Sequence, residues 1–297
     1  MAVKHDVFAL LKTYPAVAIA TAGVLGLLVG SFLNVVILRL PRRMEWQWRK
    51  DSREILGLSA DAGENDAPAP PGIVVESSHC PKCGHKLAPW ENIPLVSFLA
   101  LGGKCRGCKT PISWQYPSVE AFTGLLFALV AWRFGMSWQA AAALVATGFF
   151  IAMSGIDIRT TLLPDSLTLP LLWFGLLISL VPVFVAPEQA ILGAAVGYLS
   201  LWSVYWLFKL VTGKEGMGFG DFKLLAAIGA LCGWKAIFPV VLMSSVIGAI
   251  VGSVLLMVQG RDRATPIPFG PYLAAAGWVQ LLYGDALLDR YLQLVAP

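Results

Sequence analysis

The sequence predicts an all-α polytopic membrane protein with about eight transmembrane helices and a small cysteine-containing domain between the first and the second helix. Hydrophobic residues make up 57% of the 297 residues and charged residues only 13%, whereas about 25% of the residues in soluble domains are charged. The mean hydropathy is +0.70. Apolar segments long enough to cross a bilayer recur along the chain. One long polar region, which contains four of the five cysteines, interrupts them.

The first apolar segment, residues 15–38, is predicted to be a retained membrane helix. It is too long for the apolar core of a signal peptide, and it lacks a small-residue cleavage site. Seven further segments bring the predicted total to eight spans: residues 119–132, 138–156, 167–185, 190–210, 222–234, 236–258 and 269–288. We interpret 222–234 as a short true span whose start is sunk below the membrane surface.

The distribution of Lys and Arg predicts the orientation. If the region after the first span is cytoplasmic, the alternation of eight spans places most of the 22 Lys and Arg residues on the cytoplasmic side, as the positive-inside rule requires. Both termini are then periplasmic. The predicted organisation is a first transmembrane helix (1–40), a cytoplasmic loop domain (41–116) and a seven-helix transmembrane domain (117–297). The net charge of +4 without a long basic run gives little support for a nucleic-acid partner.

Two CxxC pairs, Cys80 with Cys83 and Cys105 with Cys108, predict a zinc site. Each pair directs two thiolates at one point, and the two pairs together complete the tetrahedron that zinc prefers. Four thiolates describe a closed structural site. An iron centre or a redox dithiol fits the same ligands, and His79 and His85 are the alternative ligands, although we interpret them as solvated loop residues. The fifth cysteine, Cys232, is interpreted as a packing residue.

Three aspartates lie beside apolar spans, where an acidic side chain is energetically costly and is therefore expected to have a specific role. Asp157 ends one span, Asp165 follows Pro164, and Asp221 lies at the head of another span after Gly218 and Gly220; the predicted topology brings all three to the cytoplasmic side. Two carboxyl groups that share a proton can perform aspartyl-protease chemistry. The alternative is that Asp221 or Asp165 is only an N-cap. The glycines before Asp221 are expected to provide positive φ angles and a close approach for substrate.

Several motifs in one order resemble the type IV prepilin peptidases, over nearly the whole chain. They are GSFLNVVILRLP, CPKCGH, CRGCKTPIS, YPSVE, IDIRTTLLPD and GMGFGDFKLLAAIGA. The resemblance implies that Asp157 and Asp221 are the catalytic pair and that the domain 117–297 is catalytic. It also implies a location in the bacterial inner membrane and, as substrates, prepilins and pseudopilins with a basic leader, cleaved after a glycine on the cytoplasmic face.

The same resemblance implies a second activity, N-methylation of the new amino terminus with S-adenosylmethionine. The residues themselves show no sign of it, because no GxGxxG follows a strand. The resemblance ties Gly103 and Lys104 to methylation, and their alternative interpretation is a solvated turn beside a zinc-binding knuckle. Residues 44–76 have no functional interpretation.

Two other classes of function compete with the protease. A transporter would use boundary acids to relay ions or protons, but it usually places them near the membrane midplane and contains structural repeats. A membrane-anchored zinc ribbon that only recruits partners would leave Asp157 and Asp221 without a role. The acids are predicted to cluster on one side of the membrane, which favours the protease.

Overall fold

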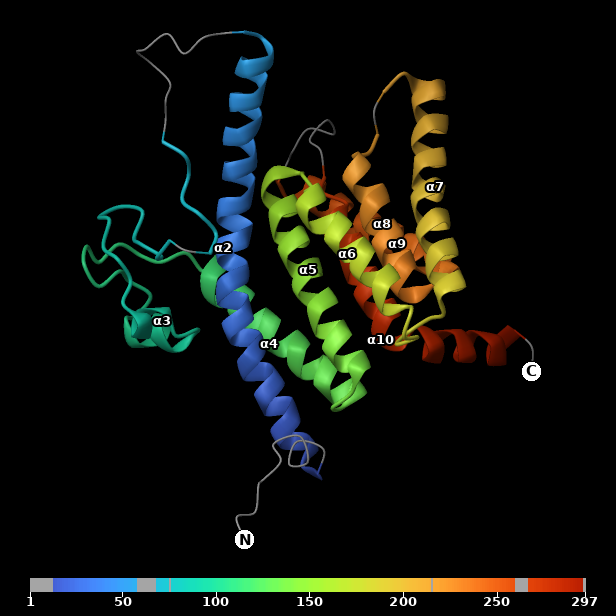
Figure 1. The fold of residues 1–297 in the computed structure, drawn as a ribbon, viewed down its shortest axis with the longest axis horizontal. Coiled ribbons are helices and arrows are strands. Elements are labelled where there is room, and N and C mark those ends of the chain that lie inside the picture. The colour runs from blue at the N-terminus through green and yellow to red at the C-terminus, as the bar shows by residue number, and fades with distance from the viewer. Residues whose placement is uncertain (1–12, 58–67, 75, 215, 260–266, 296–297) are drawn as a thin grey trace. The chain divides into compact units, whose positions relative to one another are not determined.

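The computed structural model describes residues 13–57, 68–74, 76–214, 216–259 and 267–295, and the described chain is helical (Figure 1). Within these ranges, two isolated β-bridges join extended parts of the backbone. The elements in order are α2 (Pro15–Ile55), η1 (Pro89–Asn92), α3 (Val96–Ala100), α4 (Gln115–Phe134), α5 (Trp138–Thr160), α6 (Asp165–Ile178), α7 (Pro187–Thr212), α8 (Phe219–Cys232), η2 (Trp234–Ala236), α9 (Ile237–Gln259) and α10 (Gly270–Val295).

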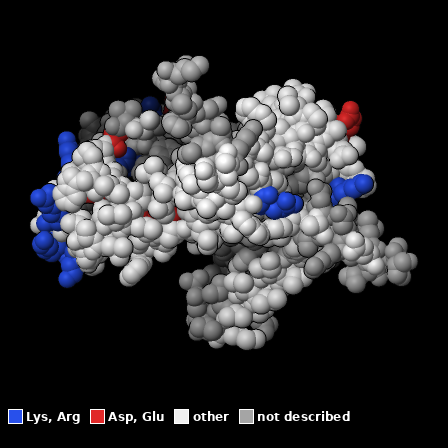
Figure 2. Space-filling model, turned by 90° about the horizontal axis from the view of Figure 1, so that it is seen from below, with Lys and Arg blue, Asp and Glu red and all other residues white. Residues whose placement is uncertain are grey.

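The all-α class is therefore confirmed, and every predicted span overlaps a helix. Among the described residues, four helical segments are long and apolar enough to cross a membrane: Pro15–Ile55, Trp138–Thr160, Pro187–Thr212 and Trp234–Val254. The face of the molecule in Figure 2 shows few Lys, Arg, Asp or Glu residues. The protein is thus a membrane protein with multiple membrane-spanning helices.

Several helix ends differ from the predicted segments, among them the ends of α2 and α6. The first helix continues through Pro41 to Ile55, because the charged stretch beyond residue 43 forms i,i+4 pairs, Arg49 with Glu45 and Gln47 with Asp51, that support a helix in water. Helix α6 ends at Ile178, before the predicted residue 185, and turns follow it.

The chain forms two compact units, one of residues 20–128 and the other of residues 129–297 with the N-terminal residues up to 19. In the first unit, α2 lies against α4 through glycines. A Cβ on Gly26 would lie 2.7 Å from the carbonyl oxygen of Thr123, and one on Gly30 would lie 2.8 Å from the Cα of Glu120. Small residues allow two helix backbones to approach this closely, as is usual between membrane helices.

In the second unit, α8 is the central helix. It packs against α6, α7 and α10, and the residues from Phe222 to Leu231 are almost all buried. A helix that is apolar nearly all round is covered either by protein or by lipid, and here protein neighbours cover most of it. The crossing with α7 is close, because a Cβ on Gly193 would overlap the carbonyl oxygen of Gly229. Helix α8 therefore holds its first turn, and Asp221 within it, at a fixed position.

Candidate active site

Asp157 lies in the last turn of α5 and is 4% exposed. Its Oδ2 accepts a hydrogen bond of 2.9 Å from the backbone N–H of Gly270, the first residue of α10. Helix α5 ends just beyond it, where Thr161 adopts a left-handed conformation and its N–H donates to the carbonyl oxygen of Asp157. Helix α10 thus holds the carboxyl group in one orientation.

Asp221 lies in the first turn of α8 and is 7% exposed. The N-cap of this helix is Gly218, so Asp221 is not the cap that the alternative interpretation required. Among the described residues, its Oδ1 is buried without a hydrogen-bond partner. A buried polar atom of this kind is uncommon and needs an explanation, and a catalytic role is one such explanation.

The two carboxyl groups lie in the same region of the unit, because Gly220, next to Asp221, and Gly270, whose N–H binds Asp157, both lie against Leu163. The two aspartates are more than 60 residues apart in the chain, and both belong to the same compact unit. Two like charges in a buried site cannot both ionise easily, so a pair of this kind retains one proton between them. The predicted pair is therefore brought together, in an arrangement suited to acid and base chemistry.

Asp165 has a different environment. It is the first residue of α6, whose N-cap is Pro164. Its two carboxylate oxygens accept hydrogen bonds of 2.6 and 2.7 Å from Nζ of Lys223, and its side chain is 57% exposed. Asp165 thus links α6 to α8 at the surface. The capping role considered for its side chain is wrong, because no side-chain cap hydrogen bond forms there.

The glycines near the aspartates work by size and not by backbone conformation. Gly218 has φ −81°, and neither it nor Gly220 is among the glycines with positive φ, so that expectation was wrong. A Cβ on Gly220 would lie 2.6 Å from the Cβ of Leu163, and one on Gly270 would lie 3.0 Å from a methyl group of Leu163. Leu163 is thereby in contact with the starts of both α8 and α10.

Gly270 is the residue that the sequence did not identify. A Cβ at this position would lie 2.7 Å from Oδ2 of Asp157. The signal available was a glycine between Phe269 and Pro271 at the head of an apolar segment, but nothing in that pattern indicates that its N–H faces an aspartate 113 residues earlier.

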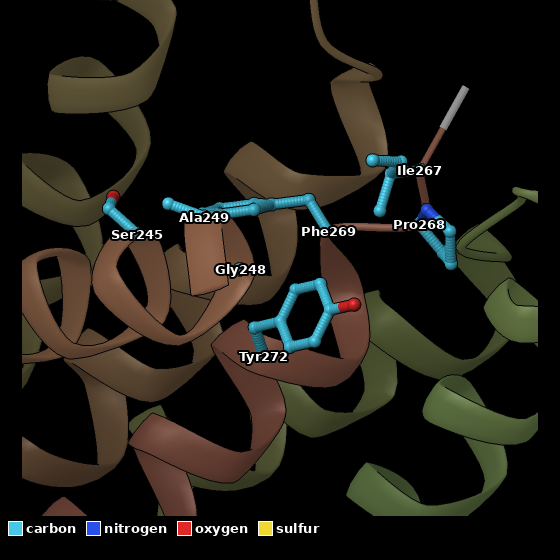
Figure 3. A pocket seen from close by; sticks show the side chains of 7 residues that line it. All are labelled: Ser245, Gly248, Ala249, Ile267, Pro268, Phe269 and Tyr272. Atoms are coloured by element: carbon cyan, nitrogen blue, oxygen red, sulfur yellow. The ribbon is translucent and has the colours of Figure 1, made fainter. Parts of the chain in front are cut away.

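A cavity lies on the chain next to Gly270 (Figure 3). It is lined mainly by apolar groups, and Tyr272 and Ser245 contribute hydroxyl groups. Its remaining lining residues are Gly248, Ala249, Ile267, Pro268 and Phe269. The cavity is formed by α9, α10 and the residues immediately before α10.

The four predicted cysteines form one cluster, with all sulfur atoms within 4.8 Å of one another. Cys80 and Cys108 are 3.8 Å apart and Cys83 and Cys105 are 3.9 Å apart, sulfur to sulfur. Tetrahedral zinc with bonds of about 2.3 Å separates its sulfur ligands by about 3.8 Å. The cluster therefore fits a metal ion of this size.

The backbone builds both halves of the cluster in the same way. The N–H of Cys80 donates to the carbonyl oxygen of His85, and the N–H of Cys105 donates to that of Thr110. In each knuckle a second N–H, four residues after the first cysteine, donates back to that cysteine's carbonyl oxygen. Hydrogen bonds from the side chain and backbone of Thr110 lower the pKa of Cys108 to about 6, whereas at Cys83 a hydrogen bond from the backbone of His85 is outweighed by burial and the other three thiols, which raise the pKa of Cys83 to about 11.

The histidines are not part of the metal cluster in the described chain. Nε2 of His85 lies 3.1 Å from Oε2 of Glu91, and His79 forms a β-bridge with Lys86. Glu91 is buried and accepts a 2.7 Å hydrogen bond from the N–H of Ala88. This bond, together with His85, lowers the pKa of Glu91 below its ordinary value.

Comparison with known proteins gives a consistent result along the chain. Residues 24–134 match the Bacterial Peptidase A24 N-terminal domain, and residues 144–253 match the Type IV leader peptidase family. The chain is 60% identical to the prepilin leader peptidase/N-methyltransferase of Xanthomonas campestris pv. campestris, over 96% of this chain and 98% of that protein. It is 53% identical to the same enzyme of Pseudomonas aeruginosa, over 95% and 96%.

The chain belongs to the type IV prepilin leader peptidase/N-methyltransferase family. The predicted resemblance is confirmed, and with it a bifunctional enzyme, a leader peptidase and N-methyltransferase. This membership favours the protease over the transporter and the non-catalytic scaffold. No solved structure matches the chain.

The residues that the resemblance ties to the methyltransferase activity of this family lie between α3 and the second knuckle. Gly103 has φ +67°, its N–H donates to the carbonyl oxygen of Phe98, and a Cβ on it would lie 3.1 Å from the ring of Phe98. Lys104 forms a β-bridge with Pro111. The positive φ and the close contact with Phe98 explain why a glycine occupies position 103. The role of Gly103 and Lys104 in methylation stays a prediction.

Proposed function

We propose that this protein cleaves the basic leader of type IV prepilins and pseudopilins with Asp157 and Asp221 and then methylates the new amino terminus. The observation that supports the proposal is that two buried carboxyl groups, at the end of α5 and the start of α8, belong to one compact unit and have neighbouring glycines that both lie against Leu163. Their chemistry needs a water molecule and a scissile carbonyl, and no nucleophilic side chain.

The hydrogen bonds and burial of the two aspartates support a different role for each. Asp157 accepts a hydrogen bond from a backbone N–H, which stabilises its ionised form, so it acts as the general base on water. Asp221 is buried and its Oδ1 has no partner in the described chain, so it carries the shared proton and polarises the carbonyl. Proton transfer from the water to Asp157 and from Asp221 to the leaving amine completes the cleavage.

The test replaces each aspartate by its isosteric amide. In membranes supplied with a prepilin, Asp157→Asn and Asp221→Asn should each abolish leader removal, because neither amide can share a proton in the pair. The matched control is Asp165→Asn, which should retain most of the activity, because this exposed group is bound to Lys223 and not to the pair. The mass of the product reports leader loss.

One outcome would oppose the assignment, and a second measurement detects misfolded variants. Full processing by either Asp157→Asn or Asp221→Asn would exclude that residue from the chemistry. Loss of methylation of a pre-cleaved pilin in the same variants would indicate a general folding defect, since the pair is not expected to take part in methyl transfer.

The proposed cofactors are zinc and S-adenosylmethionine. Cys80, Cys83, Cys105 and Cys108 would hold zinc, which has a structural role there because four thiolates leave no open position for water. Zinc measured in the purified protein tests this. S-adenosylmethionine would supply the methyl group, with Gly103 and Lys104 beside it. Lys104→Gln should lower methylation of a pre-cleaved pilin and leave leader cleavage unchanged.

The proposed topology has eight spans, with both termini in the periplasm and the cysteine domain and the aspartates on the cytoplasmic side of the bacterial inner membrane. The proposed organisation is a first helix (1–40), a loop domain (41–116) and a catalytic domain (117–297). The flanking basic residues support this orientation. Reporter fusions at residues 110 and 214, both predicted cytoplasmic, and at residue 235, predicted periplasmic, test it.

A further inference from the structure

The segment around α3 is unusually apolar for the cysteine-containing domain. No residue from Ile93 to Gly103 is charged. Several of its large side chains are exposed: Ile93 is 46%, Val96 58% and Leu99 76% exposed. Trp114, which is 74% exposed, packs against Phe98 with ring centroids 5.1 Å apart and so extends the same surface. We call these four residues, Ile93, Val96, Leu99 and Trp114, the α3 surface.

The position of this surface relative to the membrane follows from α2. Helix α2 is a candidate span, and its apolar run ends where Arg39 begins a series of basic residues. Helix α4 runs antiparallel beside it: Gly26 faces Thr123, Gly30 faces Glu120, and Nδ2 of Asn34 donates to the carbonyl oxygen of Tyr116. The start of α4 is therefore level with the apolar part of α2.

Glu120 connects α3 to this level. It is 8% exposed, and its Oε2 accepts a 2.9 Å hydrogen bond from the N–H of Leu95, the residue before α3. Leu95 has φ +58°, a strained angle for this residue, which the hydrogen bond helps to maintain. The bond joins the backbone of the α3 segment to a side chain whose Cα lies against Gly30.

The depth of α3 can be worked out from the helix rise. Gly30 precedes Arg39 by nine residues, which corresponds to about 13 Å along α2 at about 1.5 Å per residue. The side chain of Glu120 leans toward the start of α4, as helical side chains do. The atom that binds Leu95 is therefore a few ångströms closer to the level of Arg39 than the Cα of Glu120 is. Leu95 thus lies roughly 10 Å below the level of Arg39, within the apolar part of α2.

A second segment of the same unit lies at the level of Arg39, where the basic residues of α2 begin. The guanidinium group of Arg39 donates to the carbonyl oxygens of Gly72, Glu76 and Ser77, and that of Arg43 donates to Pro70. The backbone at residues 70, 72, 76 and 77 is therefore held where the basic residues of α2 begin, and the uncharged α3 segment is held deeper.

We propose that α3 and the turn before it insert into the lipid bilayer beside α2 and α4, with the α3 surface in contact with acyl chains. The occupant is lipid and not a protein partner, because the surface lies beside a helix whose own exposed residues at that level and deeper are apolar, Phe32, Leu28 and Leu25 among them. An uncharged segment with no exposed acidic or basic group is suited to that depth.

The test measures depth by fluorescence. A fluorescent amino acid introduced by codon suppression replaces Val96 in one variant and Ser77 in the matched control, in the full-length protein reconstituted into vesicles. Ser77 is exposed, lies in the same unit and is held at the level of Arg39. Quenching is measured with iodide in the water and with doxyl groups at the fifth and twelfth carbons of the lipid acyl chain. Retained leader cleavage shows that each labelled protein is folded.

The proposal predicts that doxyl lipids quench the probe at position 96 at least twofold more than the probe at 77, and that iodide quenches only the probe at 77. Equal quenching of both probes by iodide would overturn it, since α3 would then lie in water. Protection of the probe at 96 from both quenchers would also overturn it, because protein and not lipid would cover the surface.

Discussion

The substitution Gly270→Ala tests how tightly the structure fixes Asp157. Gly270 does not have a positive φ, so alanine is compatible with its backbone. The added Cβ would lie 2.7 Å from Oδ2 of Asp157, which is 0.7 Å short of the 3.4 Å at which ordinary van der Waals contact begins. Leu163 closes the other side at 3.0 and 3.1 Å, so the carboxyl group must move.

The expected loss follows from the hydrogen bond that is displaced. A hydrogen bond to a charged group contributes about 1.5–3 kcal/mol, and about 1.4 kcal/mol corresponds to a tenfold change in rate. A displacement of a catalytic group by about 1 Å also lowers rates by about 100-fold. We expect kcat/KM for leader cleavage to fall about 10- to 100-fold, with methylation of a pre-cleaved pilin unchanged.

The matched control is Gly148→Ala in the same helix as Asp157. A Cβ at Gly148 has no neighbour within 4 Å, and alanine is favoured over glycine inside a helix by about 0.5–1 kcal/mol. This variant should cleave prepilin at the normal rate. The reasoning is refuted if Gly270→Ala cleaves within twofold of the unchanged protein, or if both variants lose activity equally.

Three further predictions concern the glycine before Asp221 and the cysteine domain. Gly220→Ala places a Cβ 2.6 Å from the Cβ of Leu163 and 3.0 Å from its carbonyl oxygen, so it should lower leader cleavage by at least tenfold in the same membrane assay; unchanged cleavage would show that α8 can shift freely. Cys105→Ser should abolish metal retention by the purified protein, measured by elemental analysis, and should lower the thermal stability of the cysteine domain; full retention would exclude this residue as a ligand. Because the pKa of Glu91 is lowered in the folded protein, its stabilising contribution is present above its ordinary pKa of about 4.3 and is lost as the pH falls through the lowered value. Glu91→Gln should therefore lower the unfolding temperature at pH 7, and the difference from the unchanged protein should stay constant down to about pH 4.3 and shrink as the pH falls below it; a difference that is independent of pH below that value would contradict this.

Much of the fold was predictable from apolar length, because each predicted span overlaps a helix. The prediction was poorer at helix ends. The charged segment after Pro41 continues α2, since local i,i+4 pairs stabilise it where no apolar signal exists. The cysteine cluster was predictable from spacing alone, because two CxxC turns impose the geometry of the site locally.

Local sequence signals were enough to nominate the candidate residues: the aspartates beside apolar spans, singled out by motif resemblance, and the two CxxC pairs. Only the tertiary structure decided how Asp157 is held, by the N–H of Gly270 from the far end of the chain, and why Gly220 is a glycine, which is its contact with Leu163. The reason is physical. Hydropathy and spacing describe each segment alone, whereas the contacts that orient a carboxyl group join helices that meet only after the chain has folded.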